Sequence, residues 1–173
     1  MAVPLIIDAM RAGDIPAAIQ VQQASFEPHL LESRAVFEDR FGRFGEFFLV
    51  VREGDELVGY ALAFPWLLGT CPENDRPFPA QLPKPDCFYL HDITLLARCR
   101  GAGTAVRMLA SISEMAVTAG FECLSLVSVA QAGGYWDRQG FTELEGLDVA
   151  VLEKILASYG EGSRLMVRPL LPA

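Results

Sequence analysis

The sequence lacks the features that mark membrane and nucleic-acid-binding proteins. No segment approaches the roughly 18 uninterrupted apolar residues of a membrane span, and the longest candidate, Tyr60–Leu68, contains Pro65. Basic residues are outnumbered, with 14 Lys and Arg against 22 Asp and Glu and a net charge of −8. Because phosphate binding needs a basic face, we expect neither a membrane nor nucleic acid as a partner. The acidity is compatible with a cationic substrate such as an amine, and equally with solubility alone.

Metal-binding and export signals are also missing. The four cysteines, Cys71, Cys87, Cys99 and Cys123, show no CxxC spacing, so we expect reduced thiols and no metal site. The N-terminal stretch lacks the basic start, long apolar segment and small-residue cleavage site of a secretory signal. These observations favour a cytoplasmic protein.

The composition is that of a folded domain. With 51% hydrophobic and 21% charged residues, the chain has enough apolar material for a core. A length of 173 residues is typical of one domain, so we expect residues 1–173 to form a single domain.

Hydrophobic patterning predicts alternating strands and helices. The expected strands are 3–8, 46–52, 56–64, 87–97, 122–129, 141–147 and 164–170. The expected helices are 15–24, 30–41, 101–119, 132–138 and 149–157. The alternation in the second half indicates an α/β fold with a mixed, partly parallel, twisted sheet of about six to seven strands and helices on both faces.

One long segment resists assignment to a helix or strand. Residues 65–85 hold six prolines, a composition that cannot form a helix or a central strand. The segment is either a surface loop or rigid bridge between strands, or a lid beside a substrate site. Both interpretations stay open at this point.

A glycine-rich turn, RCRGAGTAVRML at residues 98–109, lies between an expected strand and an expected helix. Bare backbone at a helix N-terminus is suited to binding an anion. A P-loop would need Gly-Lys-Ser/Thr, whereas here Gly103 precedes Thr104 and Ala105. A dinucleotide fingerprint would need a third glycine where Val106 stands.

A third pattern fits this turn. Residues 100–105, Arg-Gly-Ala-Gly-Thr-Ala, match the Arg/Gln-x-x-Gly-x-Gly/Ala signature of GNAT superfamily N-acetyltransferases. Upstream, YLHDITLL (89–96) resembles that family's strand four, and downstream YWDRQGF (135–141) resembles its FYEKLGF block. With the order of elements, the resemblance extends over nearly the whole chain.

The resemblance implies acetyl-CoA as co-substrate. Its pyrophosphate is expected on backbone amides at the start of the third helix, and its pantetheine arm against main-chain groups of strand four. The residues implied at the pyrophosphate are Arg100, Gly101, Ala102, Gly103, Thr104 and Ala105. Those implied at the pantetheine are Ile93, Thr94 and Leu95. Arg98 and Arg107 add long-range attraction or are solvated surface charges.

Transfer of an acetyl group to an amine also needs a proton acceptor. Tyr89-Leu90-His91 resembles the His-Leu-His of arylalkylamine N-acetyltransferases, with only the second histidine kept. Strand alternation places Tyr89 and His91 on one face and Leu90 and Asp92 on the other. His91 is therefore a candidate base, and the alternative is a histidine hydrogen-bonded within the sheet. Asp92 is a lesser candidate.

The departing thiolate needs a proton donor. In the family a tyrosine often lies near the CoA sulfur, and alignment of the glycine and phenylalanine places Trp136 there and Tyr135 just before it. An indole N–H donates a hydrogen bond but does not give up its proton. Tyr135 is the candidate acid and Trp136 a CoA-binding residue. The alternatives are core packing of Tyr135, protonation by solvent, and donation by Ser128.

The predicted function is acetyl-CoA-dependent N-acetylation of the primary amine of a small molecule, by direct attack in a ternary complex. Phe26, His29, Phe37 and the proline-rich segment are expected at the acceptor site. One alternative is acetylation of a protein N-terminus or lysine. Another is a non-catalytic CoA-binding module, since Trp136 replaces the usual tyrosine. Dimers are frequent in the family, so the resemblance also allows a homodimer, and the oligomeric state stays open.

Overall fold

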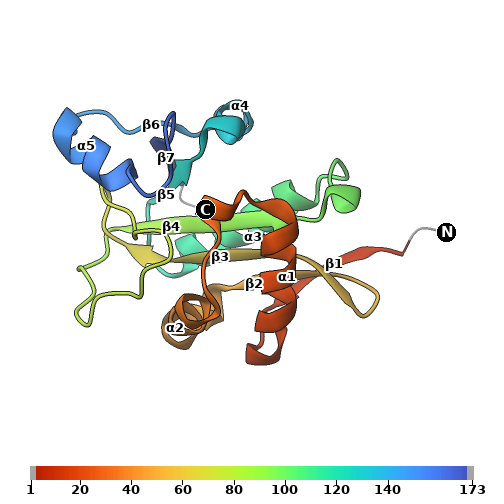
Figure 1. Ribbon diagram of the computed structural model, residues 1–173. Coiled ribbons are helices and arrows are strands. Elements are labelled where there is room, and N and C mark those ends of the chain that lie inside the picture. Colours follow the sequence, from red (N-terminus) through yellow and green to blue (C-terminus); the bar gives the residue numbers. More distant parts are fainter. Residues whose placement is uncertain (1–2, 171–173) are drawn as a thin grey trace.

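Seven strands form one sheet in the computed structural model, which describes residues 3–170. The strands are β1 (Leu5–Ala9), β2 (Leu49–Glu53), β3 (Glu56–Trp66), β4 (Cys87–Leu95), β5 (Cys123–Ser128), β6 (Thr142–Glu143) and β7 (Arg164–Pro169). The helices are α1 (Ile15–Ser25), α2 (Arg34–Phe44), α3 (Thr104–Thr118), α4 (Gly133–Arg138) and α5 (Val149–Leu156). Figure 1 shows how they follow one another along the chain. None of the described helices is both long and apolar enough to cross a membrane.

The strand order is β1-β2-β3-β4-β5-β7-β6, and among the neighbouring strands of residues 3–170 only β4 and β5 run parallel. Their pairing is brief, covering Phe88 with Leu124 and Tyr89 with Ser125. Beyond Tyr89, β4 stays paired with β3 as far as Leu95, while its other edge has no strand partner among the described residues. The mixed, partly parallel sheet predicted from the sequence is confirmed.

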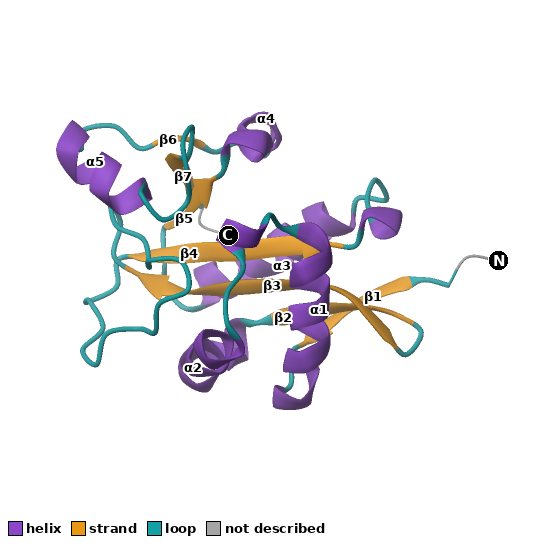
Figure 2. Cartoon of the chain, in the orientation of Figure 1, coloured by secondary structure: helices purple, strands orange, loops and turns teal. Residues whose placement is uncertain are grey.

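Helices cover both faces of this sheet, as predicted. Figure 2 shows α1 and α2 in front of the strands and α3 behind them. On the α3 face, Met108, Leu109 and Ile112 pack against strand residues such as Leu90 and Leu126. On the other face, Ile15, Val21 and Phe37 pack against Tyr60 and Phe64, among others. Alternation along β2–β5 supplies both cores, which hold the central strands in place.

A β-bulge interrupts β4 at its midpoint. In the β3–β4 register Leu62 pairs with Asp92 and Ala63 with Leu90, so His91 is an extra residue on β4. The extra residue shifts the alternation by one. The expectation that His91 and Asp92 lie on opposite faces is therefore wrong: both side chains lie on the α1–α2 face.

Several element boundaries differ from those predicted. The helix expected at 30–41 begins at Arg34, because the Ser33 hydroxyl accepts from the Val36 N–H (3.5 Å) and caps it. The strand expected at 141–147 shortens to two residues, Thr142–Glu143. β3 continues through Pro65, which is tolerated because β2 pairs with β3 only as far as Ala61.

The proline-rich segment forms an ordered loop, residues 67–86, between β3 and β4. Its Phe78 is 5% exposed and packs edge-on against Phe44 and Phe64. On the other side Tyr159 donates a hydrogen bond to the Pro72 carbonyl (2.6 Å). The loop is thereby fixed both to α2 and to the segment that follows α5.

Candidate functional site

A cavity of about 580 Å³ lies along the part of β4 that has no partner strand. We call it the large cavity. Its lining comes from β4, the glycine-rich turn, the start of α3, and α4. The lining residues are Ser25, Phe26, Ile93, Thr94, Leu95, Arg100, Gly101, Gly103, Thr104, Ala105, Val106, Ala132, Tyr135 and Trp136. Every residue expected to contact CoA lines this cavity except Ala102, which lines a neighbouring cavity with Arg98 and Arg107.

The glycine-rich turn has the backbone shape that its sequence suggested. Gly101 and Gly103 have φ of +88° and +73°, in the left-handed region that glycine adopts at little cost. Gly103 immediately precedes α3, whose first turn has no side-chain cap. The N–H groups of that turn are therefore free to bind an anion at the large cavity.

The arginines around this turn are largely committed to other contacts. Arg98 forms ion pairs with Glu56 (2.6 Å) and Glu53 (3.4 Å), which fits its interpretation as a surface charge. The Arg100 Nε atom donates to the Leu95 carbonyl (2.9 Å), and this bond joins the turn to β4. The anion-binding capacity of the turn thus resides mainly in its backbone.

A smaller cavity of about 110 Å³ adjoins the large one. The two cavities share Phe26, Ile93, Ala132 and Trp136. The small cavity is further lined by Leu30, Asn74, His91, Asp92, Val127, Val129 and Tyr159. Bound groups in the two cavities would therefore meet over Ile93 and Trp136.

The residues expected at the acceptor site differ in whether they line these cavities. Phe26 lines both cavities, and the proline-rich loop contributes Asn74. Phe37 lines neither cavity: it is fully buried and packs edge-on against Tyr60 with ring centroids 5.6 Å apart. His29 lies beside Gly160 and also lines neither cavity.

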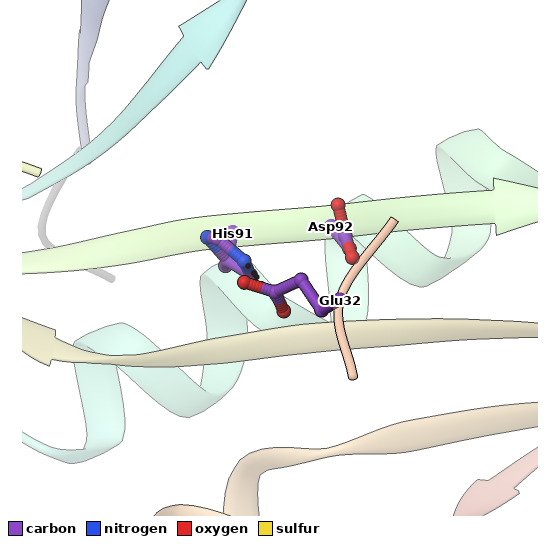
Figure 3. Close-up of side chains that lie close together, drawn as sticks. All are labelled: Glu32, His91 and Asp92. Carbon is purple, nitrogen blue, oxygen red and sulfur yellow. Dashed lines mark ion pairs between the residues drawn. The ribbon is translucent and has the colours of Figure 1, made fainter. Parts of the chain in front are cut away.

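His91 belongs to a buried ion group that the sequence analysis missed. Glu32 Oε1 lies 2.7 Å from Arg40 Nη2, and Glu32 Oε2 lies 3.2 Å from His91 Nε2. Arg40 Nη1 also contacts His91 Nε2. These three side chains are at most 2% exposed. Figure 3 shows Glu32 pointing toward His91, with Asp92 next along the strand.

The same group holds the proline-rich loop. Arg40 Nη2 donates to the carbonyls of Glu73 (3.2 Å) and Arg76 (3.5 Å). Glu32 Oε1 accepts from the Asp75 N–H at 3.2 Å. The backbone of Glu32 is held in turn by a reciprocal pair of hydrogen bonds with the Gln22 amide. Arg40 and Glu32 therefore link α1, α2, the loop and β4.

The surroundings shift the pKa values of Glu32 and Asp92 in opposite directions. Burial by itself would raise the pKa of Glu32, but His91 and Arg40 hold that pKa below its usual value. For Asp92, burial and the nearby Glu32 outweigh the attraction of His91 and Arg40 and raise the pKa to about 6. The Tyr60 hydroxyl donates to Asp92 Oδ2 at 3.2 Å. Asp92 can therefore exchange a proton near neutral pH at the wall of the small cavity.

Glu32, His91 and Asp92 also have the donor types of a metal site, with ligand atoms within 4.8 Å of one another. The Arg40 guanidinium already contacts the Glu32 carboxylate and His91 Nε2. A metal ion there would be repelled by this charge and would have to displace it. We therefore assign Glu32 and His91 to the buried ion group with Arg40, and Asp92 to its hydrogen bond with Tyr60.

Tyr135 and Trp136, both on α4, line the large cavity. The Tyr135 hydroxyl is buried and has no hydrogen-bond partner among residues 3–170, although its side chain lines the large cavity. Burial raises the pKa of this hydroxyl. The Trp136 ring packs edge-on against the Tyr135 ring, with ring centroids 4.9 Å apart. Ser128 lines neither cavity, and its hydroxyl donates to the Val129 carbonyl (3.3 Å).

Comparisons with known proteins agree with this geometry. Residues 15–141 match the family model described as the acetyltransferase (GNAT) family. A search of the curated proteins gave no match.

Solved structures share the fold. N-acetylglutamate synthase from Neisseria gonorrhoeae, complexed with coenzyme A and N-acetyl-glutamate, gives a TM-score of 0.68 at 21% identity over 99% of this chain. This chain spans only 36% of that synthase. The ribosomal-protein-S18-alanine N-acetyltransferase from Escherichia coli gives 0.68 at 15% identity, covering 98% of this chain and 96% of that chain. The loading GNATL domain of CurA from Lyngbya majuscula gives a TM-score of 0.74 at 10% identity. The match covers 96% of this chain and 98% of that domain.

Removal of Arg40 from the buried group of Arg40, Glu32 and His91 should strongly lower the stability of the fold. Arg40→Met leaves the Glu32 carboxylate buried without its guanidinium, and we expect the free energy of unfolding at pH 7 to fall by about 3–5 kcal/mol. Since the pKa of Glu32 is lowered in the folded state, the stability it contributes is present above its unfolded pKa and is lost as pH falls. The deficit of Arg40→Met should therefore shrink toward about pH 4. Urea denaturation of the wild type and the variant at both pH values measures this loss of unfolding free energy.

The matched control is the double variant Arg40→Met/Glu32→Gln, which removes both charges. It should recover at least half of the lost stability, because no uncompensated charge remains buried. Equal stability of the single and double variants at pH 7 would contradict the assignment of the lost stability to the unpaired carboxylate.

Proposed function

Since the chain belongs to the acetyltransferase (GNAT) family, we propose that it transfers the acetyl group of acetyl-CoA to the primary amine of a small molecule by direct attack in a ternary complex. We also propose that residues 1–173 form one such domain. The observation that carries the proposal is the meeting of two cavities at Ile93 and Trp136. One cavity has an anion-binding turn at its edge, and the other has a carboxylate that titrates near neutral pH.

In this proposal acetyl-CoA occupies the large cavity. The Arg100 amide already donates to the Ala97 carbonyl (3.3 Å). The amides of residues 101–105, at and just before the uncapped N-terminus of α3, bind the pyrophosphate of acetyl-CoA. The backbone groups of residues 93–95 (Ile93, Thr94 and Leu95) that face away from β3 bind the pantetheine arm as an added strand would; among them, the Leu95 carbonyl already accepts from Arg100. Trp136 supplies an apolar wall where the acetyl group would lie.

The amine occupies the small cavity and attacks the thioester carbonyl as a neutral nucleophile. We propose that the His91–Asp92 pair accepts the proton that the nitrogen loses. The Nε2 atom of His91 already contacts both Arg40 and Glu32, so it is engaged by its buried neighbours. Asp92 then presents the acceptor oxygen to the cavity, and His91 positions it and the amine. Such general-base catalysis contributes roughly 100-fold or more.

Collapse of the tetrahedral adduct breaks the carbon–sulfur bond and releases CoA thiolate. We propose that Tyr135 protonates this thiolate, because its hydroxyl lacks another partner and its ring lies at the large cavity. The proton balance then closes when solvent reprotonates Tyr135 and removes the proton held by the His91–Asp92 pair.

Binding of acetyl-CoA to the turn is tested with paired glycine variants. Gly103→Ala places a side chain at φ +73° next to the phosphate-binding amides, and we expect acetyl-CoA affinity to fall at least about 10-fold. Gly120→Ala is the control: it has φ of +87°, lies at the other end of α3, and has no atom within 4 Å of the added Cβ. It should show similar backbone strain with unchanged affinity.

The measurement is the shift in melting temperature with acetyl-CoA, compared with NAD and ATP. At about 100 times Kd the wild type should gain roughly 2.7 kcal/mol. No shift with acetyl-CoA would overturn the proposed function, and equal affinity loss in both glycine variants would remove the turn from the binding site.

The pH dependence of kcat/KM tests the proton acceptor. Because the pKa of Asp92 is about 6 in the folded protein and the base must be ionised, kcat/KM should fall as pH drops below about 6. His91→Ala and Asp92→Asn should each lower kcat/KM about 100-fold. Loss of the acidic limb only in Asp92→Asn assigns the proton to Asp92, and loss only in His91→Ala assigns it to His91. A limb that survives in both variants contradicts the proposal.

Tyr135→Phe tests the proton donor. The variant keeps the ring that packs on Trp136 and removes only the hydroxyl, so we expect kcat to fall about 10- to 100-fold while the KM for acetyl-CoA stays within a factor of about three. Steady-state release of free thiol measures both. An unchanged kcat would mean that solvent protonates the thiolate.

A further inference from the structure

The small cavity is lined by an acidic side chain and by no lysine or arginine among residues 3–170. Asp92 is the carboxylate at its wall, and the other polar side chains there are Asn74, His91 and Tyr159. With a pKa of about 6, Asp92 is ionised at the mildly alkaline pH at which amines are acetylated. A bound molecule therefore meets a negative charge and no opposing positive one.

The nearest cation cannot serve a substrate. Arg40 lies behind His91, is fully buried, and is already neutralised by Glu32 at 2.7 Å. Its Nη2 atom is further occupied by the carbonyls of Glu73 and Arg76. Freeing this guanidinium would leave the buried Glu32 carboxylate without its arginine partner, which is unfavourable.

The walls and volume restrict the rest of the acceptor. Leu30, Val127, Val129 and Ile93 make much of the lining apolar. A volume of about 110 Å³ is well below the 300–1,000 Å³ of ordinary ligand pockets. Only the amine and a short, uncharged stem fit inside.

We propose that the acceptor is a small primary amine that carries no carboxylate near its nitrogen, so that free amino acids are excluded as substrates. This inference rests on the proposed function. A carboxylate two or three bonds from the nitrogen would be brought close to the Asp92 carboxylate in a site of low dielectric. An amide or alkyl group at the same position would meet no such repulsion.

The test compares three acceptors with the same number of non-hydrogen atoms: 3-methylbutylamine, 3-aminopropanamide and β-alanine. The full-length protein is assayed with saturating acetyl-CoA at pH 8, and kcat/KM is obtained from thiol release. We expect at least one uncharged amine to be acetylated, with kcat/KM for β-alanine lower by about 100-fold. Comparable or better use of β-alanine would overturn the proposal.

Asp92→Asn links the discrimination to its cause. The variant lowers the rate with every acceptor, so the ratio of kcat/KM between the amide and β-alanine is the relevant quantity. That ratio should fall below about 10 once the charge is removed. Glu38→Gln is the control, since it removes a carboxylate that pairs with Arg34 at an exposed site on α2, and its ratio should match the wild type. An unchanged ratio in Asp92→Asn would overturn the charge argument.

The shift in melting temperature with acetyl-CoA distinguishes failure of the proposed acceptor class from failure of the proposed function. If acetyl-CoA binds and neither uncharged amine is acetylated, the substrate class is wrong while the binding half of the proposed function stands. Acetylation of a peptide N-terminus under those conditions would identify the other acceptor class. If acetyl-CoA does not bind, the proposed function itself fails.

Discussion

The brief parallel pairing of β4 with β5 is the constraint on which the site depends. Only two residue pairs join the strands, and the strands then separate while β4 stays fixed to β3 through Leu95. Two cores, one beneath α1 and α2 and one beneath α3, hold β4 against its neighbours on both faces of the sheet. The separation exposes backbone groups that would otherwise pair. A ligand can satisfy them, and the two cavities open where a continuous sheet would have closed them.

The bulge at His91 adds a second constraint. Had β4 alternated regularly, Asp92 would point to the α3 core, where an ionised carboxylate would be unpaired and costly. The extra residue turns Asp92 to the face of Tyr60 and places it beside His91 at the small cavity. Ile93 and Leu95 then pack on the α3 side. One inserted residue thus places the Asp92 carboxylate at the cavity and keeps the core intact, as bulges near functional sites often do.

How far the sequence predicted this site varies with the range of the interactions involved. The anion-binding turn is local: glycines, a following helix and a family signature stand within six residues, and all are found together in the structure. The Arg40–His91 contact joins residues 51 positions apart, and no local pattern encodes that pairing. One signal was present, since Arg40 occupies the apolar face of α2 with Val36, Phe37 and Phe41. A charged residue in that position implies a buried partner, but the sequence does not say which. The bulge was missed for a related reason, because strand alternation assumes an unbroken register.

The two cavities differ in the sign of the charge that they favour. At the edge of the large cavity, uncapped amides at the start of α3 favour an anion. At the small cavity, Asp92 disfavours anions and favours an amine. Since Arg40 and Glu32 neutralise each other, the charge of Asp92 is not cancelled by its buried neighbours. Each substrate would be repelled or left unpaired in the other's place, so the charge distribution sets their orientation before any contact with Ile93 or Trp136. In the proposed reaction the acetyl group and the amine would meet in the apolar region between the two ends, where water competes least with proton transfer.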